Sequence, residues 1–314
     1  MQSKPLRIGT RGSRLALTQA EIVRTALVDS HGFTAADVEI VVITTTGDRV
    51  TDRPLGEIGG KGLFTKEIEE ALSDRRIDLA VHSAKDMPTL LPPGLGLAGY
   101  LPREDVRDAI VVRPSLAVEG IRSLVDLPLG AKVGTASLRR GALVRRLRPD
   151  LQVEVFRGNV QTRLDKLERG VVDATLLAVA GLKRLGQAQV ATEILDAEAF
   201  PPAVGQGAIA IETRLDDAAT ARLLAPILDP ATAIALEAER AFLLTLDGSC
   251  RTPIAGHAVV VGDRLTFRGL ILKPDGSESH EIVEEGAAAE AAAIGRAAGG
   301  VLRARGGPDF FVGD

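Results

Sequence analysis

The sequence predicts an α/β protein of two lobes, followed by a small α+β domain. Strand-like and helix-like segments alternate in two series separated near Pro102, as in βαβ units of mainly parallel sheets. After about Pro230 the pattern changes to long helices and a hairpin. We therefore expect a first lobe of residues 1–102 with 204–225, a second lobe of 103–203, and a C-terminal domain of 226–314.

The first series begins with a short apolar strand, Leu6 to Gly9, and a helix for which Ser13 is the expected N-cap. A β-branched strand over 38–45, a helix over 64–75 and a strand over 77–81 follow. Ligands of open α/β sheets bind at the carboxyl ends of the strands. The loops that follow these strands are therefore candidates for a site.

The second series resembles the first in its alternation. It is predicted to contain strands over 109–112, 132–134, 153–156 and 174–178 and helices over 137–148 and 160–169. Pro201-Pro202 interrupts it, and one further strand over 208–212 follows. This late strand indicates that the chain crosses back to the first lobe, so we expect the ligand site in a cleft between the lobes.

The C-terminal segment carries a different pattern. It is predicted to form a helix over 231–246, a hairpin of 254–261 and 265–272 around Gly262-Asp263, and an alanine-rich helix over 287–303. Cys250, the only cysteine of the chain, lies in the loop that opens this domain.

Composition restricts the class of protein. With 45% hydrophobic and 25% charged residues, the chain has an ordinary globular composition. No signal-peptide pattern and no membrane-length apolar stretch is seen, and a single cysteine suits a reducing cytosol. The net charge of -4 argues against a nucleic-acid partner. We expect a cytoplasmic protein that binds neither membrane nor nucleic acid.

Arginine dominates the basic residues, with 30 arginines against 8 lysines. A GC-rich genome would produce the same bias, so the positions of the arginines must decide. Four of them fall at or just after predicted strand ends of the second lobe: Arg139, Arg140, Arg157 and Arg163. Arginine binds carboxylates and phosphates through paired hydrogen bonds. This placement favours a substrate that carries several acidic groups.

Three loops could bind anions through backbone amides at a helix start or a glycine-rich turn. They are Gly9 to Ser13 with Arg11, Gly59 to Lys66 with Lys61, and Gly134 to Arg140 with Thr135 and Ser137. The glycines and lysine of the second loop do not have the spacing of a P-loop. This loop therefore gives no support for a nucleotide-dependent transferase.

Two further segments leave alternatives open. In His82-Ser83-Ala84-Lys85-Asp86, the polar residues are either a site at a strand end or a core histidine and a turn cap. Cys250 is either an inert buried thiol or a nucleophile whose pKa Arg251 lowers. The histidines lack ligand spacing and no second cysteine exists, so no metal site is expected.

Taken in order, these motifs resemble the hydroxymethylbilane synthase (porphobilinogen deaminase) family over nearly the whole chain. The resemblance is carried by His82 to Asp86, Gly134 to Arg140, Arg157-Gly158-Asn159, Leu177 to Arg184, Pro202 to Gly207 and Gly248-Ser249-Cys250. Ala84 and Ser249 depart from residues frequent in the family, but both are small and neither removes a reactive group.

The resemblance implies two lobes like those of periplasmic binding proteins and a monomeric transferase of tetrapyrrole and heme biosynthesis. Such an enzyme joins four porphobilinogen units to a dipyrromethane cofactor, each with loss of ammonia, and hydrolysis then releases hydroxymethylbilane. It further implies that Cys250 holds the cofactor through a thioether and that Asp86 is catalytic.

The remaining site residues are likewise implied by the resemblance. Cofactor binding is expected from Lys61, Ser83, Lys85, Asp86, Thr135, Ser137, Arg139, Arg140 and Gly158, and substrate binding from Arg11, Ser13, Arg157, Arg163 and Arg184. The alternative from another class is a two-lobed protein that captures an anionic solute without chemistry. It would require neither Asp86 nor Cys250.

Overall fold

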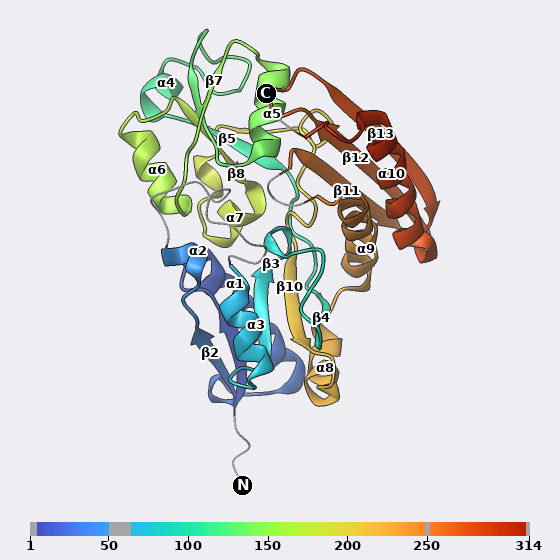
Figure 1. The fold of residues 1–314 in the computed structure, drawn as a ribbon. Coiled ribbons are helices and arrows are strands. Elements are labelled where there is room, and N and C mark those ends of the chain that lie inside the picture. Colours follow the sequence, from blue (N-terminus) through green and yellow to red (C-terminus); the bar gives the residue numbers. More distant parts are fainter. Residues whose placement is uncertain (1–4, 50–63, 249–251, 312–314) are drawn as a thin grey trace. The chain divides into compact units, whose positions relative to one another are not determined.

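The structure is a computed structural model that describes residues 5–49, 64–248 and 252–311 (Figure 1). Two compact units are distinguished. The first comprises Met1–Glu104 and Ala208–Ala233, and the second Asp105–Gly207 and Ile234–Asp314. The chain therefore crosses from the first unit to the second after Glu104, returns after Gly207 and crosses again within one helix, α9 (Pro230–Thr245).

The first unit contains a five-stranded sheet in the order β2-β1-β3-β10-β4. Its strands are β1 (Leu6–Thr10), β2 (Val38–Val42), β3 (Leu79–Ser83), β4 (Leu95–Tyr100) and β10 (Ile209–Arg214). β1 pairs in parallel with β2 and β3, whereas β10 is antiparallel to both β3 and β4. Only β10 opposes the common direction of this sheet.

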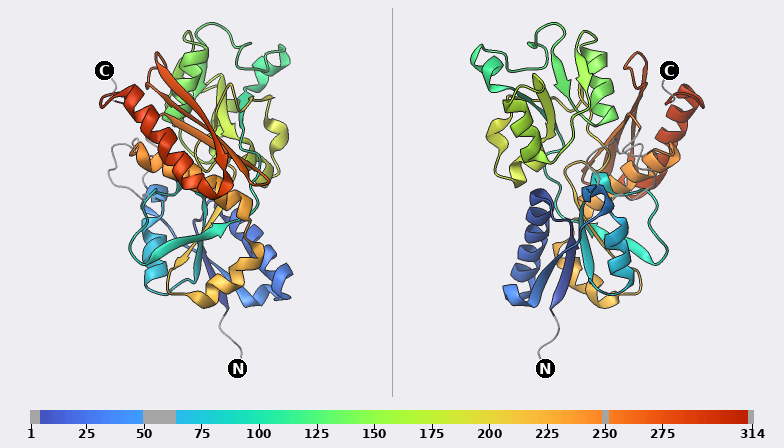
Figure 2. Two further views of the ribbon diagram at one scale, coloured as in Figure 1. Left: turned by 90° about the vertical axis from the view of Figure 1, so that its right-hand side faces the viewer. Right: turned by 60° about the vertical axis from the view of Figure 1, so that its left-hand side comes forward.

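Helices cover both faces of the first sheet (Figure 2). Ala20, Val23 and Leu27 of α1 (Arg14–His31) pack on one face with Ile8 and Val81. On the other face, α3 (Lys66–Ser73) buries Ile68, Ala71 and Leu72 against Ile77, Ala80 and Leu95. The sheet is buried on both faces, which explains the nearly continuous apolar runs of its strands. The short helices α2 (Thr46–Arg49) and α8 (Ala218–Leu224) complete this unit.

The second unit contains a sheet in the order β7-β6-β8-β5-β9, the same arrangement position by position. Its strands are β5 (Asp108–Val112), β6 (Lys132–Gly134), β7 (Gln152–Glu154), β8 (Ala174–Ala178) and β9 (Glu193–Ile194). Here β5 alone opposes the other strands. The expected mainly parallel sheets are thus confirmed, and each contains one reversed strand where the chain crosses between units.

Four helices belong to this second sheet: α4 (Pro114–Val118), α5 (Leu138–Leu147), α6 (Val160–Glu168) and α7 (Val179–Arg184). Leu116 and Leu143 pack on one face of the sheet, and Leu167 and Leu182 on the other.

The C-terminal segment forms an antiparallel sheet of β11 (Ile254–Val261), β12 (Arg264–Leu272) and β13 (Ser279–Ala287), with α10 (Ala291–Gly306) packed against it. The predicted hairpin is confirmed. Ala255, Leu270 and Leu272 of this sheet belong to the same buried cluster as Leu143 of α5. The core of the C-terminal sheet is therefore continuous with that of the second sheet.

Several predicted elements differ in extent. The strand predicted over 38–45 ends at Val42, and the helix predicted over 287–303 begins only at Ala291, because Ala287 still pairs with Arg264 as the last residue of β13. The sequence interpretation missed three strands, β4, β9 and β13.

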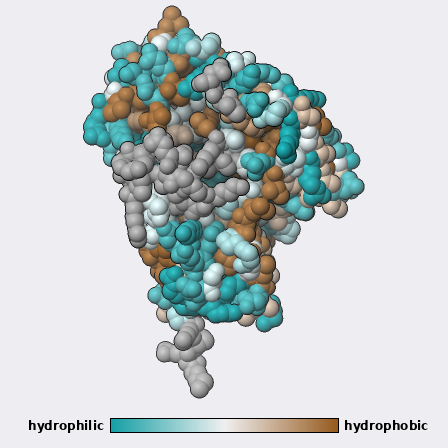
Figure 3. Space-filling model, in the orientation of Figure 1, coloured by the Kyte–Doolittle hydropathy of each residue, from teal (hydrophilic) through white to brown (hydrophobic). Residues whose placement is uncertain are grey.

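Hydrophilic and hydrophobic residues are interspersed on the face shown in Figure 3. Val118 and Leu129, each 86% exposed, are among the most exposed apolar side chains, a normal feature of protein surfaces. Among the described residues, no single helix has the length and apolarity to cross a membrane; the bent pair Ala218–Ile227 and Pro230–Thr245 meets those criteria together, by length and composition only.

Candidate functional site

The first unit carries a pocket at the carboxyl ends of β1 and β3. Its lining includes Arg11, Ser13, Gln19, Phe64, Thr65, His82, Ser83 and Asp86. Ser13 caps α1, since its hydroxyl accepts from the amide of Ala16 at 3.3 Å, as predicted. The guanidinium of Arg11 lies over the ring of Phe64, with 4.1 Å from Cζ to the ring centroid. A cation and a helix N-terminus thus face the same pocket.

Gln19 orients the hydroxyl of Ser83 in this pocket. Its Nε2 lies 3.0 Å from Ser83 Oγ, and the Gln19 side chain is buried. The sequence interpretation missed Gln19, although a polar residue within the apolar stripe of α1 was an available signal.

Asp86 is the last residue of a one-turn 3₁₀ helix, Ala84–Asp86, that follows β3 directly. Its side chain is exposed, lines the pocket and has no hydrogen-bond or ion-pair partner among the described residues. A carboxylate that caps a turn accepts a hydrogen bond from a backbone amide. Asp86 accepts none among the described residues, so it is not a turn cap. Lys85, the preceding residue, is half-buried.

Behind the pocket lies a buried polar group of His82, Glu212 and Glu69. His82 Nε2 is 3.1 Å from Oε2 of Glu212, which is fully buried on β10. His82 is thus a hydrogen-bonded core histidine, one of the two alternatives that the sequence left open, and it also lines the pocket. Burial, reinforced by the nearby charge of Glu212, raises the pKa of Glu69 despite the opposing effects of Thr65 and His82.

The second unit has an equivalent turn where β6 leads into α5. Ser137 caps α5 by accepting the amide of Arg140 at 3.4 Å, and Thr135 accepts the amide of Ser137 at 3.1 Å. Both hydroxyl oxygens therefore organise the turn itself. The turn fixes the direction in which α5 presents Arg139 and Arg140, which are only 3% and 7% exposed.

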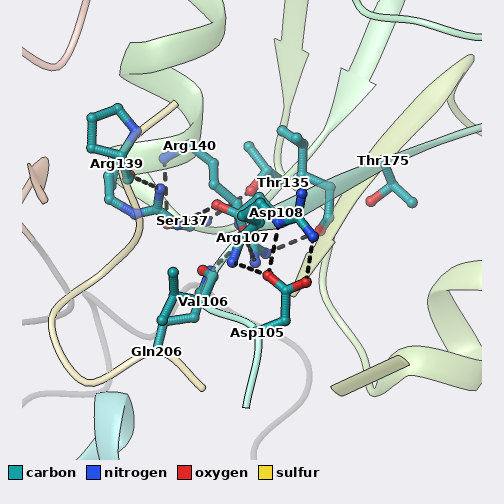
Figure 4. Close-up of polar contacts among 12 residues, drawn as sticks. Asp105, Val106, Arg107, Asp108, Thr135, Ser137, Arg139, Arg140, Thr175 and Gln206 are labelled. Carbon is teal, nitrogen blue, oxygen red and sulfur yellow. Dashed lines mark hydrogen bonds and ion pairs between the residues drawn. The ribbon is translucent and has the colours of Figure 1, made fainter. Parts of the chain in front are cut away.

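Arg139 and Arg140 converge on one carboxylate, Asp108 at the start of β5 (Figure 4). Arg139 Nη2 donates to Asp108 Oδ2 at 2.7 Å, and Arg140 Nη2 donates to Oδ1 at 2.6 Å. Gln206 Nε2 donates to the same Oδ1 at 2.9 Å. The sequence interpretation missed Asp108 and Gln206, although Gln206 stands inside the motif Pro202 to Gly207.

Positive charges outnumber the negative charge of Asp108 in this cluster. Burial alone would raise the pKa of Asp108, but the charges of Arg139 and Arg140 and their hydrogen bonds hold it well below its usual range. A third guanidinium, Arg163, donates through Nη2 to Thr175 Oγ1 and to the carbonyl of Leu176. Burial, and then the charge of Arg140, lower the pKa of Arg163 to about 9. Among the described residues, Arg139 and Arg140 form ion pairs with Asp108, and Arg163 adds a third positive charge close to Arg140.

Three further predicted site residues belong to the second unit: Arg157, Gly158 and Arg184. Arg184 Nη2 donates to the carbonyl of Gly207 at 2.6 Å, and Arg157 is half-buried before α6. Gly158 has a φ of +128°, a conformation that favours glycine and lets the chain turn into the Asn159 cap of α6. Lys61, Ser249 and Cys250 lie outside the described residues.

Comparison with known proteins identifies the family. Residues 6–222 match the porphobilinogen deaminase dipyrromethane cofactor binding domain, and residues 233–304 match the porphobilinogen deaminase C-terminal domain. A curated porphobilinogen deaminase from Nitrobacter hamburgensis is 58% identical over 305 residues, which cover 97% of this chain and 95% of that protein.

Similar solved structures include periplasmic binding proteins. An ancestral cationic amino acid solute-binding protein is 16% identical with a TM-score of 0.43, covering 70% of this chain and 86% of that one. An arginine-specific periplasmic binding protein of Salmonella typhimurium is 13% identical with a TM-score of 0.41, covering 74% and 94%. On the two family matches and the 58% identity, the chain belongs to the porphobilinogen deaminase family.

Proposed function

We infer that this protein is a transferase that joins four molecules of porphobilinogen, releases ammonia at each step and yields hydroxymethylbilane by final hydrolysis. The observation that carries this conclusion is membership of the porphobilinogen deaminase family over nearly the whole chain. The reaction belongs to tetrapyrrole and heme biosynthesis. A dipyrromethane, attached to the sulfur of Cys250, is the cofactor on which the chain of pyrroles is built.

The described residues fit a cofactor and substrate that carry acetate and propionate groups. Arg139 and Arg140 pair with one buried carboxylate, Arg163 lies close to Arg140, and the Nε of each arginine has no hydrogen-bond partner among the described residues. A buried cationic N–H without an acceptor is costly, and an acidic ligand group relieves that cost. The donor set therefore suits an acidic ligand rather than an apolar one.

We assign the catalytic role to Asp86. Loss of ammonia leaves a cation on the substrate ring, and an exposed carboxylate without a protein partner is available to balance that charge. The same carboxylate moves protons between substrate nitrogen and carbon positions. Arg11, Ser13 and Ser83 line the same pocket as Asp86 and hold acidic groups of cofactor or substrate. Lys85, which precedes Asp86 in the sequence, is assigned the same role.

In the second unit, Thr135 and Ser137 shape the helix start that presents Arg139 and Arg140. Arg157, Arg163 and Arg184 hold substrate carboxylates, and Gly158 lets the backbone approach the cofactor. Lys61 holds a cofactor carboxylate. These roles follow the family pattern residue by residue and remain proposals for this chain.

Mass spectrometry of the intact protein tests the function. The purified protein is expected to exceed its sequence mass by two pyrrole units, and the extra mass should map to the peptide containing Cys250. Incubation with porphobilinogen should then add covalent species in steps of one deaminated unit. Cys250→Ser should lower both loading and activity severely, because a hydroxyl is a much poorer nucleophile than a thiolate.

A solute-binding protein with the same architecture is the rival function. It predicts an unmodified mass and no consumption of porphobilinogen, since capture of an anion needs no covalent attachment. An unmodified wild-type protein with full deaminase activity would instead refute the attachment through Cys250 while leaving the activity in place.

We further propose that the protein works as a cytoplasmic monomer and that the segment from residue 226 onward is a domain of its own that carries Cys250. The single cysteine suits a reducing compartment. Sedimentation equilibrium should give one chain of 33.0 kDa plus cofactor, and a dimer mass would contradict the monomer.

A further inference from the structure

Asp108 is a fully buried carboxylate that no role in the proposed chemistry uses. Both of its oxygens are occupied by donors from the protein: Oδ2 by Arg139, and Oδ1 by Arg140 and Gln206 (Figure 4). It lies at the first residue of β5, immediately after the chain has entered the second unit. Such a carboxylate does not meet substrate; it acts through the groups it holds.

Arg139 and Arg140 are adjacent cations that repel each other, and Asp108 is the group that keeps them side by side. Each arginine also donates Nη1 to a main-chain carbonyl, Arg139 to Pro201 at 2.6 Å and Arg140 to Leu176 at 3.0 Å. The terminal nitrogens are thus held by the protein, whereas both Nε atoms lack a partner in the part of the chain that the structure describes. This arrangement orients two guanidinium groups in advance of an acidic ligand, which reduces the entropy cost of binding.

The same network contacts two of the three segments at which the chain crosses between the units. Gln206 Nε2 bridges from the returning segment to the entering one, donating to the carbonyl of Val106 at 2.7 Å as well as to Asp108. The carbonyl of Pro201, which Arg139 holds, belongs to the returning segment, and that segment ends at Gly207. An anion that binds either guanidinium group is therefore expected to weaken the hydrogen bonds of that group to the crossover segments 105–108 and 201–207, without displacing the pair.

We propose that Asp108 is a positioning residue for anion binding by Arg139 and Arg140, and that Gln206 couples this arginine pair to the two crossover segments. The proposal rests on the proposed function, which makes the anions the acidic groups of the dipyrromethane cofactor, of porphobilinogen and of the growing chain. Asp108 sets the spacing of the two guanidinium groups, and Gln206 makes the crossover segments respond to their occupancy.

The first test compares Asp108→Asn with Asp150→Asn. Asp150 is a matched control in the same unit, where it accepts Nε and Nη2 of Arg148 at 2.7 and 2.6 Å. Asp108→Asn should raise KM for porphobilinogen by about tenfold or more, with a smaller change in kcat, because anion binding rather than the reacting atoms is affected. Asp150→Asn should leave KM unchanged, and Asp108→Glu should recover part of the loss.

The second test is a milder change, Gln206→Met, which keeps the side-chain length and removes the amide. Hydrogen–deuterium exchange should become faster in peptides covering 105–108 and 201–207, and KM should rise by a few-fold. This variant decides the question if Asp108→Asn does not fold. Unchanged exchange in both segments together with an unchanged KM would overturn the proposal, as would a folded Asp108→Asn with the KM of the wild type.

Citrate, a small tricarboxylate, separates this inference from the proposed function. At constant ionic strength it should raise the melting temperature of the wild type and of Asp150→Asn, but not that of Asp108→Asn. Wild-type protein that fails to consume porphobilinogen yet shows this citrate pattern would refute the proposed function and support the role of Asp108. Equal stabilisation of all three proteins would refute the role of Asp108.

Discussion

The two five-stranded sheets each carry a similar turn between a strand and a capped helix, but the residues around the two turns serve different roles. In the first, β1 ends in Gly9-Thr10 and Ser13 caps the following helix; in the second, β6 ends in Gly134 and Thr135 follows, with Ser137 as the cap. β1 and β6 hold the same position in their sheets. Both turns therefore end in a serine that caps the following helix, although Thr10 donates to the carbonyl of Ala16 and Thr135 accepts the amide of Ser137.

The acidic residues near these turns differ sharply. Asp86 is exposed in a pocket and has no partner among the described residues, whereas Asp108 is fully buried and holds three donors. A buried carboxylate whose two oxygens already accept from two arginines and an amide is not available to balance a substrate charge. The comparison teaches that the first unit presents a reactive group, while the second uses its carboxylate to organise cations.

The largest expected effect is that of Asp86→Asn. The amide keeps the shape but neither balances a cation nor accepts a proton, so kcat should fall by several orders of magnitude. Product formation measured by absorbance, with circular dichroism as the control for folding, checks this. Near-normal turnover would contradict the distinction between Asp86 and Asp108, because Asp86 would then have no larger role in the reaction than a structural carboxylate.

Replacing Arg139 or Arg140 by leucine should strongly reduce cofactor loading and chain growth, since either change removes a buried cation and leaves Asp108 short of a donor. Arg169→Leu and Arg222→Leu are the controls, because both arginines are exposed and should change stability by no more than about 0.5 kcal/mol. Loading is read from intact mass. Similar loading in all four variants would show that arginine placement has no functional meaning.

The two strand-end glycines sharpen the comparison of the turns. A Cβ at Gly134 would lie 2.6 Å from Cγ and 2.9 Å from Cβ of Phe156, which cannot withdraw without moving the backbone. A Cβ at Gly9 would meet Cδ1 of Ile77, the flexible end of a side chain. Gly134→Ala should therefore cost about 1–3 kcal/mol and Gly9→Ala less. Thermal unfolding measures both, and the reverse order would contradict this reading.

The smallest expected effect concerns Glu69. Its raised pKa means that the folded protein binds this proton more tightly than the unfolded chain, so its ionisation lowers stability as the pH rises above the usual carboxyl range. Glu69→Gln should raise the melting temperature at pH 7 and lose that advantage near pH 4. Glu70→Gln, at an exposed neighbour, is the control. An equal gain at both pH values would exclude ionisation as the cause.

The sequence predicted those features that depend on residues close together in the chain. The cap Ser13 was predicted correctly because a hydroxyl group before an apolar stripe satisfies helix amides. Ser137 was predicted only as a hydroxyl donor at a helix start, and the structure shows that it caps α5. β13 was missed because its alternating residues from Ser279 to Ala287 are largely polar and its partner β12 supplies the pairing. Asp108 was missed for a related reason: a carboxylate at a strand start has no local signal, and its partners lie 31, 32 and 98 residues away in sequence.

The reversed strand β10 has a consequence for synthesis of the protein. β4 pairs only with β10, which emerges from the ribosome more than a hundred residues after β4. All five strands of the second sheet lie between Asp108 and Ile194 and are complete before β10 is made. The second sheet can therefore close first on the ribosome, while the nascent first sheet keeps an open edge at β3 until Ile209–Arg214 arrives.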